Sequence, residues 1–476
     1  MTSLVPGGRY TISDLRTGSL FTETKILVFG IKTSAGTLAV NTPTKVFSAD
    51  QAAEYAGRGS QAHQEVAAVF QAYRDADVTL VLMAAPAGVA ATGTLTYSGT
   101  ATTATPIYLQ VEDQTVVVPV SIGDNATTIA ASADAAVAEY VNLHVTSGAA
   151  LAVQTLTARS IGAHGNQIRY RVIQNTPGVT VAAPGMTAGA GDPNLTTAIA
   201  SIGGARYKYW VLPDATALNL AAAITELDDR DTSARQIDGH AFIGARDTVG
   251  NLATLGLAED TKHVTVFGDP KVPANPWTWA GRVAGLRASV ENPRLTLHKR
   301  NIPGLLPPDE TEYLQPSERG TLLSSGISTF HFVSGATRVE RMVTLYKTNA
   351  LGQPSTVFRE TEVKLTASEI RQLQLVALQI YIGKVLVDDI GDRQYGVDTA
   401  DEIIDHEGIR QVMISLNLGV FETRAWTDDA DYYEAQLQVI RSGENELTIN
   451  SSPPITGTNY ENTGTIEVVT AFSVQG

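Results

Sequence analysis

Mostly apolar runs of strand length in the first part of this 476-residue chain predict a parallel sheet. Residues 25–30 and 78–83 are two such runs, and they are typical of strands buried on both faces. Between them, Ser48 and Gln51 form a capping box, and apolar residues then recur at helical spacing as far as Tyr73. Strand, helix and strand in this order predict a βαβ unit.

The same rhythm of strand and helix returns after a break in the chain. Strands are predicted at residues 209–212, 241–243 and 264–267, with helices between them. The core is therefore predicted to be discontinuous in sequence and to be built from residues 21–88 and 195–290.

A different pattern, alternation of apolar and polar residues in short runs, fills residues 89–175. Gly, Ala, Thr and Val dominate this stretch, lysine is absent, and only eight charged residues fall between 88 and 173. One predicted helix, from Thr127 to His144, interrupts five predicted strands. The pattern predicts a β-rich domain inserted into the core, on the outer surface where insertions are tolerated.

Beyond a Pro-rich stretch that follows Pro293, the pattern predicts a hairpin over residues 329–345 and helices over 367–387 and 407–418. The fold class is therefore mixed α/β, with a discontinuous α/β core, an inserted β-rich domain, an α+β C-terminal domain and extended terminal β-arms. The predicted boundaries are 1–20 for the N-terminal arm, 21–88 and 176–350 for the two parts of the core, 89–175 for the inserted domain, 351–460 for the C-terminal domain and 461–476 for the C-terminal arm.

Each end of the chain is predicted to be a β-strand without a partner nearby in the sequence. An extended segment with unpaired backbone groups tends to complete the sheet of another chain. The residues predicted to take part in such strand exchange are Arg9, Tyr10, Thr11, Ile12, Ile466, Val468, Thr470 and Phe472. The alternative is that both strands fold back onto their own core.

The net charge of −15 is unevenly distributed along the chain. From Asp388 to the end there are 17 acidic and 4 basic residues, whereas the first 387 residues are close to neutral. Acidic density of this kind argues against DNA or RNA as a direct partner, because the phosphate backbone would be repelled. It fits either a basic protein partner or a solvated face.

No catalytic or metal-binding pattern is present in the sequence. The absence of cysteine excludes disulfides, thiolate metal sites and cysteine nucleophiles, and no two histidines have metal-ligand spacing. The sequence Gly57–Ala62 matches a dinucleotide fingerprint nominally, but it follows a helix and is predicted to be a turn between helices. The acidic group Asp428, Asp429 and Asp431 is predicted to cap a helix. We therefore expect no cofactor, no metal and no enzymatic activity.

No secretion signal and no apolar stretch of about 20 residues is found, so we expect no membrane insertion.

Several segments resemble the tail sheath proteins of contractile-tailed bacteriophages, the Mu-like branch in particular. They occur in the family's order over nearly the whole chain: Asn41 to Phe70, Gly239–Phe242, Pro276–Ala280, the Pro-rich Glu291 to Pro308, Ser317–Ser328, Lys347–Gly352 and Val439–Arg441. The inserted Thr-rich domain is also a feature of that branch. Residues 388–395 are more acidic than the family pattern, which leaves the charge match to a partner open.

The resemblance implies a structural subunit that polymerises as six-fold rings, stacked in a helix around a tail tube. Contraction of this sheath would drive the tube through the host envelope for DNA delivery. The resemblance also implies that terminal arms add strands to the C-terminal domains of neighbours, and that this domain lies nearest the tube. The candidate tube-facing residues are then Asp388, Asp389, Asp392, Asp401 and Glu402.

The implied partners are further copies of the chain, the tail tube protein, and the baseplate and tail terminator proteins. The implied location is the virion tail, after assembly in the bacterial cytoplasm. Two alternatives remain: the sheath of a phage-derived contractile particle without DNA (a tailocin), which has the same subunit chemistry, and a nucleotide-dependent α/β enzyme, favoured only by the βαβ rhythm and the turn at Gly57.

Overall fold

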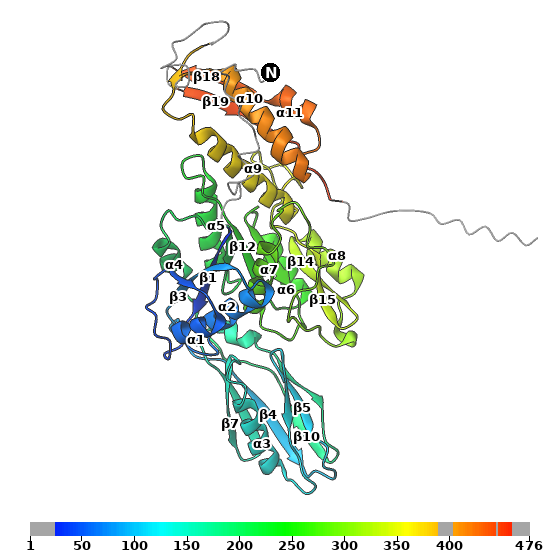
Figure 1. The fold of residues 1–476 in the computed structure, drawn as a ribbon. Coiled ribbons are helices and arrows are strands. Elements are labelled where there is room, and N and C mark those ends of the chain that lie inside the picture. The colour runs from blue at the N-terminus through cyan, green and yellow to red at the C-terminus, as the bar shows by residue number, and fades with distance from the viewer. Residues whose placement is uncertain (1–23, 389–402, 444–445, 459–476) are drawn as a thin grey trace, which may run out of the picture. The chain divides into compact units, whose positions relative to one another are not determined.

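The computed structural model describes residues 24–388, 403–443 and 446–458. The chain divides into two compact units, Met1–Val376 and Ala377–Gly476. The first unit contains an α/β core and a β-rich domain, and the second contains helices and two short sheets (Figure 1). The mixed α/β class predicted from the sequence is confirmed.

An eight-stranded sheet forms the core of the first unit. Its strands are β1 (Lys25–Ile31), β2 (Thr44–Val46), β3 (Asp77–Met83), β11 (Tyr209–Val211), β12 (His240–Ala245), β13 (Val264–Gly268), β14 (Ile327–Val333) and β15 (Ala336–Arg341). Their order across the sheet is β15-β14-β13-β12-β11-β1-β3-β2. The six central strands are parallel and the two edge strands antiparallel, so the break in the sequence leaves the sheet continuous.

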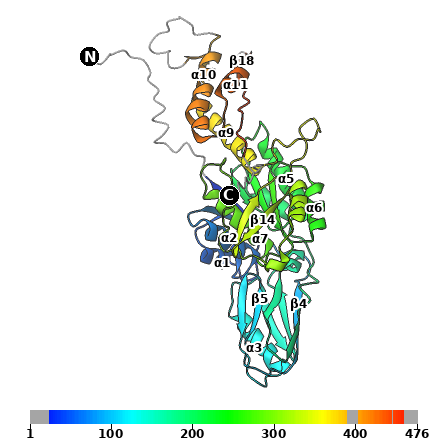
Figure 2. The ribbon, with the colours of Figure 1, turned by 90° about the vertical axis from the view of Figure 1, so that its right-hand side faces the viewer.

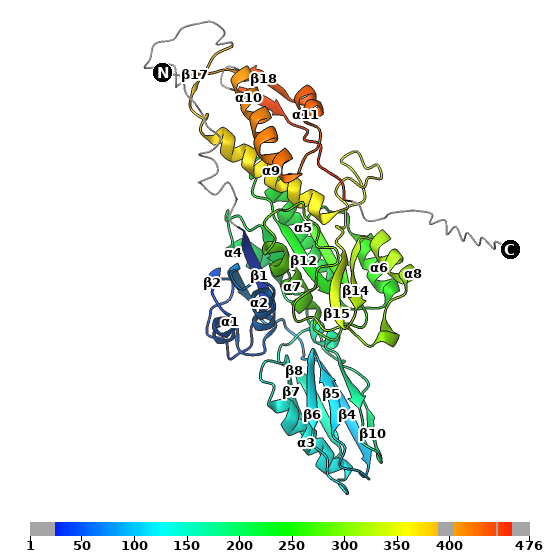
Figure 3. The ribbon, with the colours of Figure 1, turned by 45° about the vertical axis from the view of Figure 1, so that its right-hand side comes forward.

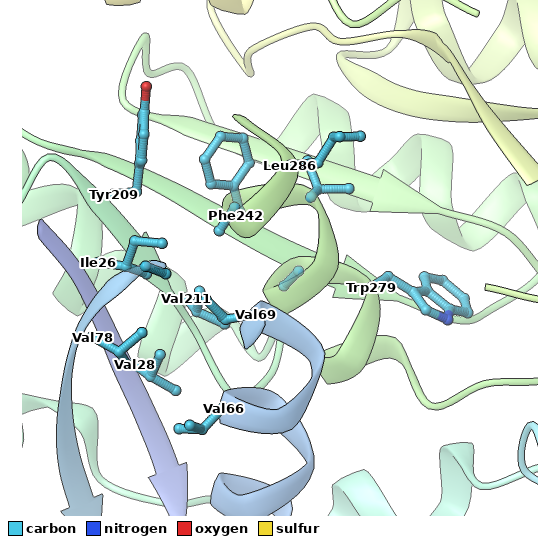
Figure 4. Packing of buried hydrophobic residues seen from close by; sticks show 14 of the residues in the cluster. Ile26, Val28, Val66, Val69, Val78, Tyr209, Val211, Phe242, Trp279 and Leu286 are labelled. Atoms are coloured by element: carbon cyan, nitrogen blue, oxygen red, sulfur yellow. The ribbon is translucent and has the colours of Figure 1, made fainter. Parts of the chain in front are cut away.

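Helices cover both faces of this sheet (Figure 3). One face packs against α1 (Ala49–Ala56), α2 (Gln61–Ala72) and α7 (Pro276–Ala288), and the other against α4 (Leu195–Ser201), α5 (Ala217–Asp231), α6 (Val249–Ala258) and α8 (Pro316–Ser324). Figure 4 shows Val66 and Val69 of α2 turned toward Val28 of β1 and Val211 of β11. Burial on both faces explains why these strands are mostly apolar runs without alternation.

The inserted domain is a β-sandwich with one helix (Figure 2). Its elements are β4 (Thr92–Gly99), β5 (Ile107–Val111), β6 (Gln114–Val118), α3 (Ala126–Ala138), β7 (Val145–Ala150), β8 (Val153–Ala158), β9 (Tyr170–Gln174) and β10 (Val179–Ala182). They form a four-stranded sheet, β10-β4-β8-β7, and a three-stranded sheet, β6-β5-β9, around one apolar cluster. Strand β10 pairs with β4, and Val89 bridges Ala190, so this sheet extends past the predicted boundary at residue 175.

Helix α9 (Thr361–Gln379) begins in the first unit, and its last three residues belong to the second. The remaining elements of the second unit are β16 (Val385–Leu386), β17 (Ile403–Ile404), α10 (His406–Leu416), a π-helical turn (Asn417–Phe421), a 3-10 turn (Glu422–Arg424), α11 (Ala430–Gln436), β18 (Gln438–Gly443) and β19 (Glu446–Asn450). Ile409 and Met413 of α10, Tyr433 of α11 and Val439 of β18 form its apolar cluster.

The predicted helix over residues 367–387 differs from the structure at both ends. It begins earlier, at Thr361, and ends earlier, at Gln379. Gly383 follows in a turn with a φ of 92°, which L side chains rarely adopt. The β-branched residues from Ile380 to Val387 also have low helix propensity. Gly383 and Lys384 therefore lie in a turn, whereas the sequence pattern predicts that they lie inside a helix.

Candidate functional site

The turn at Gly57–Ala62 connects two helices, as predicted. Gly57 ends α1, and the Ser60 hydroxyl accepts a hydrogen bond from the backbone of His63 to begin α2. The Asp429 side chain likewise caps α11, as predicted for the acidic group around it. Among the described residues, no cluster of His, Cys, Asp or Glu could hold a metal ion. No helix in the described part of the chain is long and apolar enough to cross a bilayer.

Gln61 bridges two strand ends at the place where parallel α/β sheets usually bind ligands. Such sites lie at the carboxyl ends of the strands where the chain order reverses, which here is between β1 and β11. The Gln61 amide accepts from Ile31 N at 3.3 Å and donates to Pro213 O at 2.7 Å, and so joins the two strand ends. Glu65, one turn later, is fully buried, and burial together with Asp214 raises its pKa well above the usual range.

The predicted strand-exchange residues at both termini lie outside the described residues, as do four of the five predicted acidic residues. The fifth, Asp388, is described and is solvent-exposed. Its carboxylate pairs with Arg441 at 2.6 Å, and its carbonyl oxygen is 3.0 Å from His406 Nδ1. Asp388 is therefore available to a partner only in competition with Arg441.

Among the described residues, the two small sheets of the second unit have two strands each and open edges. Strands β16 and β17 form one parallel pair, and β18 and β19 form one antiparallel pair. Within the described residues, no third strand joins either pair. Val439, Leu447 and Ile449 anchor the β18–β19 hairpin on the apolar cluster of the second unit. Two-stranded sheets are marginal alone, and a pair of strands of this kind can accept an added strand at its edge.

The inserted domain is attached to the core through a shared apolar cluster. Trp277, on core helix α7, is fully buried among the apolar residues of the inserted domain. Its ring makes edge contacts with His144 and His164, and its Nε1 donates to Gln64 Oε1 at 2.9 Å. Burial, the largest effect on both groups, lowers the pKa of His144 to about 3 and that of His164 to about 4. Both rings are therefore neutral.

A buried carboxyl group from the inserted domain lies beside this tryptophan. Glu112 accepts from Gln64 Nε2 at 2.7 Å and from His144 N at 2.6 Å. Burial, and then the neighbouring Asp113, raise the pKa of Glu112 to about 8. Nearby, the side-chain oxygen of Asn275 is buried without a hydrogen-bond partner in the described structure.

Arginines complete the attachment at the carboxyl ends of the strands. Arg246, directly after β12, donates to the carbonyl oxygens of Gln167 in the inserted domain and of Val272 and Ala274 in the core. Arg169 of the inserted domain pairs with Glu312 of the core at 2.7 Å and donates to Lys271 O. The sequence pattern did not indicate these residues. The available signal was the Trp277 and Trp279 pair, because residues two apart on a helix face different neighbours.

Comparisons with known proteins agree with this architecture. Residues 188–345 match the family model for the central domain of phage tail sheath proteins. A Mu-like prophage tail sheath protein of Haemophilus influenzae is 28% identical over 442 residues, which cover 90% of this chain and 88% of that protein. The crystal structure of a sheath tail protein from Desulfitobacterium hafniense matches with a TM-score of 0.50 at 11% identity, over 92% of this chain and 94% of that one. At 11% identity, the likeness to the crystal structure shows the fold alone.

Proposed function

We propose that this protein, which carries the central domain of phage tail sheath proteins, polymerises as six-fold rings stacked around a tail tube. Contraction of the assembled sheath would drive the tube through the host envelope for DNA delivery. In this proposal the protein is a component of the virion tail, its partners are the tube, baseplate and terminator proteins, and it has no catalytic role. The relative from the Mu-like prophage, similar over most of both chains, carries the proposal.

The open-edged pairs β16–β17 and β18–β19 support linkage of the subunits by exchanged strands. Each chain end has the alternating pattern that such an edge accepts. The backbone hydrogen bonds of an added strand contribute about 0.5–1.5 kcal/mol each. They depend on the backbone and not on particular side-chain contacts, so they can persist while side-chain contacts between subunits change. Work during contraction would come from the free-energy difference between two packings.

Deletion of residues 1–16 or of 463–476 tests this proposal. We expect each truncated subunit to stay soluble and folded by circular dichroism, but to form no tubes in negative-stain micrographs of the purified protein. The full-length chain should form them. A truncated subunit that polymerises normally would contradict strand exchange for that end.

A matched pair of substitutions sharpens the test at the C-terminal arm. In a strand, Val468 lies on the same face as Ile466 and Phe472, whereas Val469 lies on the opposite face. Val468→Asp should prevent tube formation, and Val469→Asp should allow it. Equal effects of the two changes would argue against a strand that docks through one face.

A further inference from the structure

Within the first unit, helix α9 lies against the amino ends of the parallel strands. The inserted domain lies at the opposite ends of these strands (Figures 1, 2 and 3). Lys208 directly precedes β11, and Asp238 and Gly239 directly precede β12. All of them contact α9 within the first unit. The inserted domain follows the carboxyl end of β3, and Arg246, at the carboxyl end of β12, binds it on the same side of the sheet. The sheet therefore carries an attachment at each of its two ends.

The buried side of α9 is polar, which is unusual for a helix on a core. Seven of its ten buried residues are polar or charged: Thr361, Glu362, Lys364, Thr366, Ser368, Glu369 and Gln372. A helix of this kind would ordinarily present an apolar stripe to its neighbours. The buried apolar residues of α9 are only three: Leu365, Ile370 and Leu373. The attachment therefore depends on directional contacts more than on apolar burial.

Lys364, Glu369 and Arg371 each pair with an oppositely charged side chain of the core. The carboxyl oxygens of Glu362, in contrast, are buried without a hydrogen-bond partner in the described structure, and burial raises the pKa of this group. Lys364 Nζ lies 2.9 Å from Asp238 Oδ2, and both side chains are at most 4% exposed. Glu369 lies 2.8 Å from Lys208 Nζ, also buried. Arg371 lies 2.6 Å from Asp238 and 2.8 Å from Asp231. Burial alone would raise the pKa of Asp238, but Lys364 and Arg371 hold it well below the usual range, so this carboxylate is ionised.

These contacts fit only one position of the helix along the core. A shift by four residues in one direction would bring Ser368 to the place of Lys364 and Leu373 to the place of Glu369. A shift in the other direction would bring Glu360 to Asp238 and Leu365 to Lys208. Either shift leaves buried charges without partners, which is strongly unfavourable. An apolar face, in contrast, tolerates shifts because apolar burial is non-directional.

We propose that residues 361–376 of α9 are a register-fixing mount, in which buried ion pairs hold the helix at one position on the core. Buried ion pairs contribute little net stability compared with apolar replacements, and fixing register is their best-attested use. By sequence, α9 continues into the second unit, so the mount sets where that part of the chain leaves the core. This inference concerns the single subunit and does not depend on the proposed assembly.

Paired spin labels test the mount, and the absence of cysteine in the sequence allows clean labelling. The label sites are Ala221→Cys on α5 and Val376→Cys on α9, both exposed. In the otherwise unchanged chain we expect one narrow distance distribution. In Lys364→Met/Asp238→Leu, which replaces the ion pair with apolar groups, we expect a second population displaced by about 5 Å, one helical turn.

The matched control is Lys45→Met/Asp77→Leu, at a partly exposed ion pair of the same unit, which should leave the distance unchanged. A single unchanged distance in a folded Lys364→Met/Asp238→Leu variant would overturn the proposal. Amide hydrogen exchange on the unsubstituted protein is a second measurement that needs no variant. Amides of residues 365–376 should exchange as slowly as those of β12. Exchange more than tenfold faster than in β12 would also overturn the proposal.

Discussion

At the scale of single residues, Glu112 makes the attachment of the inserted domain sensitive to pH. Burial, reinforced by Asp113, raises the pKa of its carboxyl group from 4.5 to about 8. Below about pH 4.5 the group is protonated in both the folded and the unfolded chain. Between about pH 4.5 and 8 the unfolded chain releases this proton and the folded chain keeps it. Glu112 therefore lowers the free energy of unfolding as the pH rises through this window.

Replacement of Glu112 by Gln should remove this dependence. The free energy of unfolding of the unsubstituted protein should fall relative to that of Glu112→Gln by up to about 1.4 kcal/mol per pH unit between about pH 4.5 and 8. The difference should level off above about pH 8. Denaturant unfolding of both proteins across this range measures it. Glu139→Gln, at an exposed carboxyl of the same domain, should give no such slope. Parallel curves for Glu112→Gln and the unsubstituted protein would refute a raised pKa.

At the scale of elements, one helix contributes a tryptophan to each of two apolar clusters. Trp277 of α7 packs in the inserted domain, and Trp279 packs against the core sheet, where its ring meets Phe330 edge-on. The first tryptophan thus belongs to the core by sequence and to the inserted domain by packing. An insertion that shares its apolar cluster with the core is expected to be held rigidly.

Trp277→Ala and Trp279→Ala form a matched pair that separates the two clusters. Each should lower the free energy of unfolding by about 3–5 kcal/mol, because a large buried ring leaves a cavity. Trp277→Ala should speed amide exchange mainly in β4 to β10. Trp279→Ala should speed it mainly in the core sheet. If Trp277→Ala leaves exchange in the inserted domain unchanged, the two domains do not share a cluster in solution.

The elements that the sequence predicts well are those whose buried side chains are apolar. Strands β1, β3, β12 and β13 are mostly apolar runs and were predicted within one or two residues of their bounds. The start of α9 was missed because its buried residues Thr361, Glu362 and Lys364 are polar or charged, and hydrophobic periodicity cannot detect a polar buried face. Strand β7 was missed because Ser147–Ala150 has low β-propensity and gains its order from pairing with β8.

The contacts of the candidate site were not predictable in the same way. Trp277 meets the rings of His144 and His164, which lie far from it in the sequence. Glu112 and Arg246 likewise have distant partners across the boundary, Gln64 and Gln167. All of these contacts form only when the inserted domain packs on the core. The strand-exchange residues at the two termini and most of the acidic residues stay predictions, because they lie outside the described residues. The open-edged sheets of the second unit are consistent with them.

At the scale of the whole molecule, the acidic charge is concentrated after Asp388. We propose that this region faces the tube, in which case the outer surface of the tube protein should be basic. Sheath–tube association should then weaken at least tenfold between about 50 and 500 mM salt, because exposed ion pairs are screened. Linkage between sheath subunits through backbone hydrogen bonds should persist. Cosedimentation of sheath with preformed tubes at increasing ionic strength measures both.

Asp389→Asn/Asp392→Asn should reduce this salt dependence, and Asp50→Asn, at an exposed carboxyl of the first unit, should not. Association that is indifferent to salt would favour a solvated acidic face instead.

The two attachments at opposite ends of the sheet meet on a single strand, which has a mechanical consequence. Gly239, whose carbonyl oxygen accepts from Lys364 of α9, directly precedes β12, and Arg246, which holds the inserted domain, directly follows it. A pull between α9 and the inserted domain therefore runs along about 20 Å of covalent backbone. Covalent bonds do not yield under loads that break hydrogen bonds. Strand β12 thus links the two attachments by covalent bonds. Under tension, the contacts of α9 with Gly239 and of Arg246 with the inserted domain should break before the sheet between them.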